Sequence, residues 1–548
     1  MPNHAISRRH FVQGLVFGSV AMTSGSWAKQ TFPQIIPTST LLGRVFDLVV
    51  DEAWVNYTGQ PRLATVINGS LPAPTLYFKE GETVTIRVTN RLKEPTSIHW
   101  HGILLPFEMD GVPGISFNGI GAGQTFTYQF PIKQSGTYWY HSHSGFQEQT
   151  GMIGAIVIEP RDGEPIKVDR DYVVMLSDWT DQDPMHLLSK LKAQSDFDNY
   201  QQPTAMQLLH DAKTQGWKNV IEARKMWNQM RMVPTDYTDL SAHTYTYLMN
   251  GVNPASNWTG LFQKGDKIRL RFINGSAQTI FDVRIPGLKL TVISSDGQAV
   301  EPVTVDEFRI GVAETYDVLV EPIDDAYTIF AQNIDRSGYA CGTLATQTGL
   351  KAEIPPLDKI QWLSMTDMMG DMSGKAMANH ARTEYGVSTD MHVDMPRTNL
   401  DDAGINLRNN GRRVLTYADL HSIDAIKKEQ REPTREIEMH LTGSMERYIW
   451  GFDGLTFQES SPVRIAKNER VRISLVNDTM MTHPMHLHGM WSDVRAPNGD
   501  FQVRKHTFLV QPAQKVSFDV TGEAGRWAWH CHLMYHMESG MFREVVVD

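Results

Sequence analysis

Residues 81–90 read GETVTIRVTN, and two later stretches repeat this pattern: residues 265–274 read GDKIRLRFIN and residues 468–477 read NERVRISLVN. In each stretch polar and apolar residues alternate, which is typical of a strand with one face on a hydrophobic core. Each stretch also ends in asparagine. We interpret the three stretches as equivalent strands in three related β-sandwich domains.

Short runs of strand-forming residues surround each repeat and are separated by Gly, Pro and Asn. This pattern predicts an all-β protein built from sandwich domains. Two regions differ, because one has helical composition and spacing and the other is rich in Met, Asp, Gly and Pro. The predicted order is domain 1 at 44–170, domain 2 at 171–350 with a helical insertion at 185–232, a Met-rich interdomain connection at 351–404, and domain 3 at 405–548.

The N-terminus has the layout of a bacterial export signal. Residues 7–12 read SRRHFV, and the apolar stretch FVQGLVFGSVAM begins at residue 11. The paired Arg8 and Arg9 mark the Tat type of signal, and cleavage after Ala28 would remove residues 1–28. The apolar stretch is too short and too interrupted by Gly and Ser to span a membrane. We therefore expect the Tat machinery as a partner and a soluble, periplasmic, monomeric mature protein that does not span the membrane.

Charge and cysteine content narrow the function further. The formal net charge is -11 at pH 7, and no basic block or stripe occurs, which argues against a nucleic-acid partner. The chain of 548 residues has two cysteines, Cys341 and Cys531. Cys341 reads as a small buried residue, and no disulfide is expected if Cys531 binds a metal.

Histidines occur in four H-x-H pairs, namely His99/His101, His141/His143, His486/His488 and His530/His532. An even scatter of the 20 histidines over 548 residues predicts roughly 0.7 such pairs. Residues i and i+2 of a strand point to the same face, so each pair converges on one place. All four pairs fall in the first and last β domains. A single pair is most often a surface or core feature, whereas four pairs indicate a metal site.

Residues 529–541 read WHCHLMYHMESGM and identify the metal. A thiolate, two imidazoles and a weak thioether define a blue-copper site, for which the candidates are Cys531, His536, Met541 and the upstream His483. Zinc would accept Cys and His but has no need of Met541. The eight paired histidines offer imidazole alone, which suits a copper cluster with open positions for a small molecule. Cys531 lies between two of these histidines, so its peptide links the two sites.

These motifs resemble those of the multicopper oxidases. The spacing C-x4-H-x4-M from Cys531 to Met541 matches, as does HPMHLHG at 483–489. The paired arginines, MDGVPGISFNGIGAGQTFTYQF at 109–130, TYTYLMNG at 244–251 and the Met-rich connection are similar to the copper-resistance protein A branch, and the chain is also laccase-like. The resemblance implies three cupredoxin-like Greek-key domains and four copper ions, with O2 as the oxidant.

The resemblance also implies the ligands. Type 1 copper takes His483, Cys531, His536 and axial Met541. Type 2 copper takes His99 and His486. The type 3 pair takes His101, His141, His143, His488, His530 and His532. The cluster would lie between the first and last domains, in keeping with the absence of H-x-H pairs from the middle domain.

The implied reaction is one-electron oxidation at the type 1 copper, with electrons passing from Cys531 through His530 and His532 to the cluster, where O2 becomes water. Asp110 occupies the place of the acid that supplies protons in related oxidases, and the alternative is a turn aspartate before Gly111. Relatives often carry a glutamate directly after the second type 1 histidine. Here Met537 stands there and Glu538 follows.

Methionines suggest the reductant, because thioethers favour Cu(I). Seven methionines fall in 365–395, and candidates for Cu(I) binding are Met365, Met368, Met369 and Met372, with Met481 placed two residues before His483 as in cuprous-oxidase relatives. The alternative role is core packing. The leading hypothesis is oxidation of Cu(I), and of phenols too, in periplasmic copper resistance. Its alternatives are a laccase acting mainly on phenols and a copper-sequestering protein with incidental oxidase activity.

Overall fold

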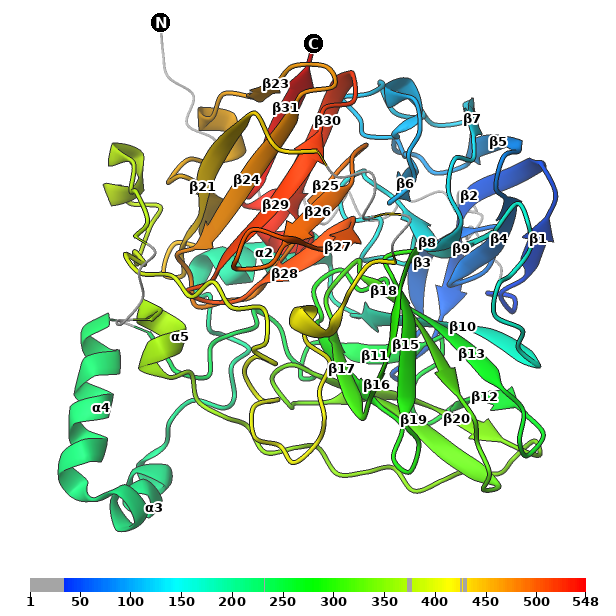
Figure 1. Cartoon of the computed structure of the whole chain (residues 1–548). Coiled ribbons are helices and arrows are strands. Elements are labelled where there is room, and N and C mark those ends of the chain that lie inside the picture. Colours follow the sequence, from blue (N-terminus) through cyan, green and yellow to red (C-terminus); the bar gives the residue numbers. More distant parts are fainter. Residues whose placement is uncertain (1–33, 231, 372–376, 424–425, 427–430) are drawn as a thin grey trace, which may run out of the picture. The chain divides into compact units, whose positions relative to one another are not determined.

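The computed structural model describes residues 34–548 except residues 231, 372–376, 424–425 and 427–430. The expected signal peptide at 1–28 and Met372 lie outside the described residues. The described strands form six sheets, which make three β-sandwich domains in chain order (Figure 1). The all-β, three-domain prediction is therefore confirmed. None of the described helices is long and apolar enough to cross a membrane.

The first domain pairs a five-stranded sheet, in the order β1-β4-β9-β8-β6, with a four-stranded sheet, in the order β3-β2-β5-β7. Its strands are β1 (Thr40–Leu42), β2 (Val45–Val55), β3 (Arg62–Ile67), β4 (Ala73–Lys79), β5 (Thr83–Asn90), β6 (His99–His101), β7 (Thr125–Pro131), β8 (Gly136–His141) and β9 (Ile153–Glu159). The 3-10 turn η1 (Phe107–Met109) follows β6. A core of buried Ile, Leu, Val, Phe, Tyr and Trp side chains fills the space between the sheets.

The second domain has a six-stranded sheet, β11-β10-β13-β18-β15-β16, and a five-stranded sheet, β12-β20-β19-β14-β17. Its strands are β10 (Arg170–Trp179), β11 (Thr246–Met249), β12 (Trp258–Leu261), β13 (Ile268–Asn274), β14 (Phe281–Arg284), β15 (Leu290–Ser295), β16 (Gln298–Val305), β17 (Glu307–Ile310), β18 (Thr315–Val320), β19 (Ala326–Asn333) and β20 (Tyr339–Ala345). Cys341 is buried on β20 and forms no disulfide.

The third domain repeats this topology with sheets β22-β21-β24-β29-β26-β27 and β23-β31-β30-β25-β28. Its strands are β21 (Arg435–Ser444), β22 (Ile449–Phe452), β23 (Val463–Ile465), β24 (Arg470–Asn477), β25 (His483–Leu487), β26 (Ser492–Arg495), β27 (Phe501–Lys505), β28 (Thr507–Val510), β29 (Lys515–Thr521), β30 (Gly525–Cys531) and β31 (Phe542–Val547). The short helix α7 (Met534–Glu538) joins β30 to β31, and η4 (Phe457–Glu459) precedes β23.

The three repeated sequence stretches form equivalent strands. Each of β5, β13 and β24 pairs in parallel with one neighbour and antiparallel with another. The terminal asparagines also make equivalent hydrogen bonds. The side-chain amides of Asn90, Asn274 and Asn477 each donate to a buried backbone oxygen 30 to 36 residues later in the chain. A polar group kept in a core must be hydrogen-bonded, which explains the shared asparagine.

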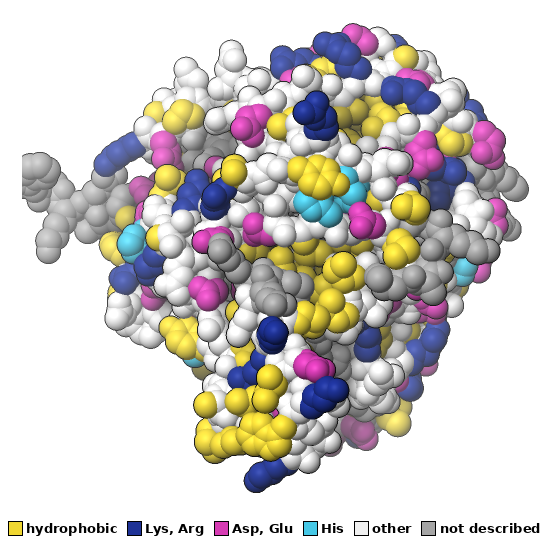
Figure 2. All heavy atoms as spheres, turned by 90° about the vertical axis from the view of Figure 1, so that its left-hand side faces the viewer, with side chains coloured by type: hydrophobic (Ala, Val, Ile, Leu, Met, Phe, Trp, Pro, Cys, Tyr) yellow, Lys and Arg dark blue, Asp and Glu magenta, His cyan; other side chains and the backbone are white. Residues whose placement is uncertain are grey.

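Three helices lie between β10 and β11, two strands that pair in the same sheet. Asp183 caps the first, α2 (Pro184–Ala193), by accepting from His186 N at 2.9 Å, and α2 buries three leucines. The helices α3 (Ala205–Gln215) and α4 (Trp217–Met230) extend away from the strands (Figure 1). Hydrophobic side chains on them are exposed, including Met206 and Trp217. Figure 2 views the side of the molecule on which α3 and α4 lie in Figure 1, and it shows hydrophobic groups gathered at the lower end.

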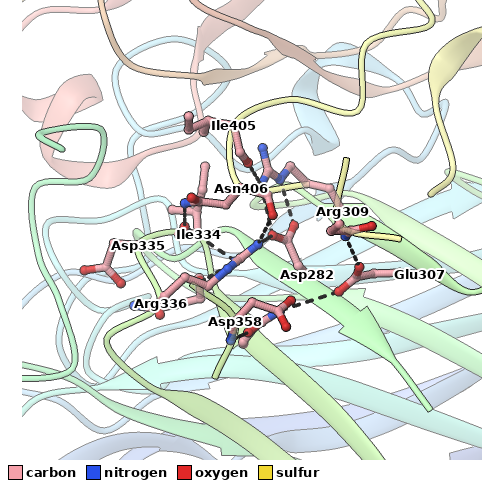
Figure 3. Close-up of polar contacts among 12 residues, drawn as sticks. Asp282, Glu307, Arg309, Ile334, Asp335, Arg336, Asp358, Ile405 and Asn406 are labelled. Atoms are coloured by element: carbon pink, nitrogen blue, oxygen red, sulfur yellow. Dashed lines mark hydrogen bonds and ion pairs between the residues drawn. The ribbon is translucent and has the colours of Figure 1, made fainter. Parts of the chain in front are cut away.

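Two arginines of domain 2, paired with a buried carboxylate of that domain, hold the segment between β20 and β21 through hydrogen bonds to its backbone. This segment, residues 346–434, extends beyond the predicted connection at 351–404 and is called the connection from here on. It contains α5 (Met365–Met369) and the 3-10 turns η2 (Arg382–Tyr385) and η3 (Tyr417–Asp419). Asp282 pairs with Arg309 and Arg336, at 2.7 Å each, and these arginines donate to the backbone oxygens of Ile405 and Asn406 (Figure 3). Residues after 400 are thereby fixed to strands β14 and β17.

Candidate metal centres

Antiparallel strand pairs bring the H-x-H motifs together. In domain 1, β6 pairs with β8, and His99 lies opposite His141. In domain 3, β25 pairs with β30, and His486 lies opposite His530. Figure 1 shows the two domains side by side, and across their boundary His143 Nε2 lies 3.4 Å from His530 Nε2.

The eight paired histidines fall into groups whose ring nitrogens lie within 4.8 Å of one another. Two groups share no member and each draws on both domains: His101, His141 and His532 form one, and His143, His488 and His530 form the other. A further group consists of His99, His101 and His486. Two sites of three histidines and one site of two therefore account for all eight residues.

Hydrogen bonds at one ring nitrogen leave the other nitrogen free to bind a metal. The Nδ1 atoms of His99, His486 and His530 lie 2.7–2.9 Å from backbone oxygens, which only accept, so Nδ1 carries the proton. The opposite Nε2 then holds a lone pair. Among the eight paired histidines, five buried ring nitrogens have no hydrogen-bond partner in the described part of the chain, namely His99 Nε2, His101 Nδ1, His141 Nε2, His486 Nε2 and His532 Nε2.

Burial keeps seven of the eight imidazoles neutral. It lowers the pKa of His101, His141, His143, His486, His488 and His532 well below the ordinary value, and neighbouring histidines lower it further. The pKa of His530 falls to about 4, also through burial. Neutral, buried and unpartnered nitrogens that converge from two domains are the donor set that a cluster of copper ions requires.

A separate site surrounds Cys531. Its Sγ lies 3.6 Å from His483 Nδ1 and 3.9 Å from His536 Nδ1, and all three side chains are buried. Met541 is also buried, and its backbone oxygen accepts from Cys531 N at 3.1 Å. Burial raises the pKa of the Cys531 thiol, so a thiolate here needs a cation beside it.

Residues outside the sequence motifs orient this site. His536 Nε2 lies 2.9 Å from Asp239 Oδ2, which belongs to domain 2, and Trp450 stacks on the His536 ring at 3.8 Å. The Thr479 hydroxyl lies 2.7 Å from His483 Nε2. Both histidines are therefore held so that Nδ1 faces Cys531. Neither Asp239 nor Thr479 was expected from sequence, because both are single residues in loops without a motif.

Two buried carboxylates contact the eight-histidine cluster. Asp110, singled out from sequence, lies 2.8 Å from His488 Nδ1 through Oδ2 and 3.4 Å from His99 Nδ1 through Oδ1. Glu148 was not expected, and its Oε2 lies 2.6 Å from His141 Nδ1. Burial raises the pKa of Glu148 well above the ordinary value.

A cavity of about 570 Å³ opens onto this cluster from the side of Glu148. Histidines 141, 143, 530 and 532 line it together with Val112, Met537 and Phe542. Glu538 also lines the cavity and is exposed. The cavity is large enough to admit O2 and to release water.

The methionines singled out from sequence lie in two environments. Met365 and Met369 are 38% and 39% exposed on α5. Met368 on the same helix and Met481 beside the Cys531 site are each 1% exposed and belong to the hydrophobic core.

Comparisons with known proteins agree with this geometry. Three family models, each described as multicopper oxidase, match residues 49–163, 170–349 and 430–548. They cover one sandwich domain each.

The chain is similar to copper resistance protein A of Escherichia coli, with 53% identity over an alignment of 600 residues that covers 99% of both chains. It is 51% identical to copper resistance protein A of Pseudomonas syringae pv. tomato, again over 99% of both chains. Among solved structures, the laccase of Botrytis aclada has the same fold, with a TM-score of 0.65 and 22% identity over 93% of this chain and 88% of the laccase.

Proposed function

The chain belongs to the multicopper oxidase family, and from this premise we propose that it oxidises Cu(I) to Cu(II) and reduces O2 to water in periplasmic copper resistance. The observation that carries the proposal is the exposed pair Met365 and Met369. Relatives of this chain at 50–53% identity are named copper resistance proteins. A protein site that binds Cu(I) from solution needs soft thioether groups that solvent can reach.

As a multicopper oxidase the protein carries four copper ions, and its residues fit them. We propose that His483, Cys531, His536 and Met541 hold the type 1 ion. We assign His99 and His486 to the type 2 ion. The two groups of three histidines described above would hold the type 3 pair. When bound, the coppers accept electrons one at a time and deliver four of them to O2.

The protein's own residues position the ligands and conduct electrons and protons. The peptide bonds between Cys531 and its two flanking histidines form the shortest covalent path between the sites. Asp110 links His99 to His488, and Glu148 holds His141 at the mouth of the cavity. We propose that Asp110 passes protons toward the cluster, since its Oδ2 already faces a ring N–H.

Export through the Tat pathway and a periplasmic location remain part of the proposal. They rest on the paired Arg8 and Arg9 in the sequence. Phenol oxidation at the same type 1 site is the competing activity. A metal reductant and a phenol both deliver single electrons to the type 1 site, so the ligand set by itself accepts either.

The test is steady-state O2 consumption by the copper-loaded protein with Cu(I) and with a methoxyphenol. Deleting residues 365–395 is too disruptive, because Asp367 in this segment pairs with the Arg408 guanidinium. The variant is instead Met365→Leu/Met369→Leu, with Met206→Leu on α3, 75% exposed, as the matched control.

We expect a raised KM for Cu(I) in the double variant, with phenol turnover unchanged, and no effect in the control. If phenol is the better substrate and the double variant behaves as the wild type, the protein is a laccase. Excess bound copper without turnover of Cu(I) would instead support sequestration.

A further inference from the structure

A second polar cluster is buried in domain 3, apart from the proposed copper ligands. It consists of His380, Glu384, His440 and Asp478, whose donor atoms lie within 4.8 Å of one another. All four side chains are at most 5% exposed. His440 lies on β21 and Asp478 follows β24, whereas His380 and Glu384 belong to the connection.

The geometry points to a divalent transition-metal site, and we propose that it binds Cu(II) through His380 Nδ1, His440 Nδ1, Glu384 Oε2 and Asp478 Oδ2. That Cu(II) at this site is the product of turnover rests on the cuprous oxidase activity proposed above. The site's capacity to bind a metal does not depend on that activity.

The distances between the donors are those of ligands around one ion. His380 Nδ1 lies 2.7 Å from Glu384 Oε2 and 3.5 Å from Asp478 Oδ2. His440 Nδ1 lies 2.7 Å from Asp478 Oδ2 and 3.5 Å from Glu384 Oε2. Ligands at roughly 2.0–2.2 Å from a metal lie about 3 Å apart when adjacent, so a small shift would accommodate an ion.

Each carboxylate has one oxygen held by the backbone and one left for the cluster. Ala381 N donates to Glu384 Oε1 and Val393 N donates to Asp478 Oδ1, both at 2.9 Å. In the part of the chain that the structure describes, no lysine or arginine forms an ion pair with Glu384 or Asp478. Two buried carboxylates without a lysine or arginine beside them favour a cation.

The outer ring nitrogens also face carboxylates. His380 Nε2 lies 3.3 Å from Asp394 Oδ1, and His440 Nε2 lies 3.8 Å from Glu438 Oε1. Neither nitrogen has a hydrogen-bond partner among the described residues, and Glu438 also pairs with Lys515. Asp394 is 72% exposed, which leaves a path to solvent.

Domain 2 has the same backbone without the cluster. Strand β10 pairs with β13 as β21 pairs with β24, and in these registers Met175 occupies the position of His440. The backbone N–H of each residue donates to a side-chain oxygen, at 2.7 and 2.8 Å. Gly275 takes the place of Asp478, since the backbone N–H of each donates at 2.9 Å to a backbone oxygen of the parallel neighbouring strand, β10 or β21. The fold therefore does not need a histidine or an aspartate here.

The donor set selects the metal. Two imidazoles with two carboxylates suit Cu(II), which also binds such ligands more tightly than Zn(II) or Ni(II). The thioethers that suit Cu(I) are absent from this group of four. Asp478 is moreover the neighbour of Thr479, whose hydroxyl contacts His483 of the Cys531 site. The cluster and the Cys531 site are therefore linked through two adjacent residues of the chain.

The test is equilibrium dialysis of the four-copper protein against Cu(II), with copper counted by mass spectrometry and the extra ion examined by electron paramagnetic resonance. The variants are His380→Gln/Glu384→Gln and, copying domain 2, His440→Met/Asp478→Gly. His210→Gln, an exposed histidine on α3, is the control. Retention of the blue thiolate absorption shows that each variant has folded.

We expect wild type and control to bind one further Cu(II), with nitrogen hyperfine structure in its spectrum. The His380→Gln/Glu384→Gln variant should raise the dissociation constant of this further Cu(II) at least about 100-fold. Loss of a residue that only hydrogen-bonds to a ligand has a smaller effect. Equal copper content in wild type and folded variant would overturn the proposal, as would tighter binding of Zn(II) than of Cu(II). The assay involves no turnover, so failure of Cu(I) oxidation is a separate result.

Discussion

Domains 2 and 3 have the same sheet order strand for strand, yet of these two domains domain 3 supplies the proposed copper ligands. Strand register allows a residue-by-residue comparison. Phe281 pairs with Ile310 as His483 pairs with Val510, and Asn274 and Asn477 donate to these two partners. Phe281 therefore occupies the place of His483.

The same register identifies the other replacements. Val283 pairs with Ala331 as Met485 pairs with Cys531, so Ala331 stands at the position of the thiolate. Arg284 pairs with Phe330 as His486 pairs with His530. Domain 2 fills this part of the sandwich with apolar groups and an ion-pair network around Asp282, whereas domain 3 fills it with neutral metal ligands. The cupredoxin-like fold thus accommodates either apolar and ion-paired side chains or metal ligands at these positions.

The largest effect is expected from giving domain 3 the residue of domain 2 at the thiolate position. Cys531→Ala should abolish the blue absorption and lower the rate of O2 consumption about 1000-fold or more, which corresponds to about 4 kcal/mol. The reason is loss of both a metal ligand and the covalent path to His530 and His532. Cys341→Ala, at the other buried cysteine, should leave absorption and rate unchanged. A blue, active Cys531→Ala protein would refute the assignment.

The second prediction concerns the ion-pair network of domain 2. Asp282→Asn leaves Arg309 and Arg336 buried without their carboxylate, which should destabilise domain 2 by about 3–5 kcal/mol. Hydrogen exchange of amides in β14 and β19 measures the change. Asp47→Asn, which removes an exposed pair with Arg87, should have no measurable effect. Unchanged exchange in the Asp282 variant would mean that the network contributes no stability.

The third prediction tests the contribution of domain 2 to the Cys531 site. Asp239→Asn should lower kcat 10- to 100-fold and shift the type 1 reduction potential, because Asp239 holds the His536 ring through Nε2. Steady-state rates and redox titration measure both effects. Asp236→Asn is the matched control, since burial raises the pKa of Asp236 to about 8 and the group is largely neutral already. Equal effects in the two variants would contradict a positioning role.

The smallest effect is expected from pH in the copper-free protein. Burial lowers the pKa of His530 and of His506 to about 4, against roughly 6.5 in an unfolded chain. The unfolded state therefore binds more protons below pH 6.5, and stability falls as pH falls. Each of these histidines should lower the free energy of unfolding by about 1 kcal/mol between pH 7 and pH 5.5.

Domain 2 should respond differently over this range. Burial alone would raise the pKa of Asp282, but Arg309 and Arg336 hold it below its ordinary value, so its contribution is lost only in stronger acid. Hydrogen exchange at pH 5.5 should then show weakened protection in β25 and β30 before β14 and β19. Equal loss in both strand pairs would contradict the electrostatic difference between the domains.

The fold was largely predictable because its signals are local. Alternating polarity in three stretches and the recurrent asparagine identified three equivalent strands before any contact was known. The four H-x-H pairs were equally visible, since residues two apart on a strand share a face. The grouping of eight histidines into sets of three, three and two was not visible, because every set of three takes members from both domains.

The sequence by itself determined the family, the three β-sandwich domains, the candidate ligands and the choice of copper, because each depends on residue type and short spacing. Only the tertiary structure decided which single residues support them. Asp239 reaches His536 across almost 300 positions, and His380 meets His440 and Asp478. Such contacts depend on the packing of separate domains and of the connection, which leaves no periodic trace along the chain. Burial then turns these contacts into function by removing water from the groups that bind metal.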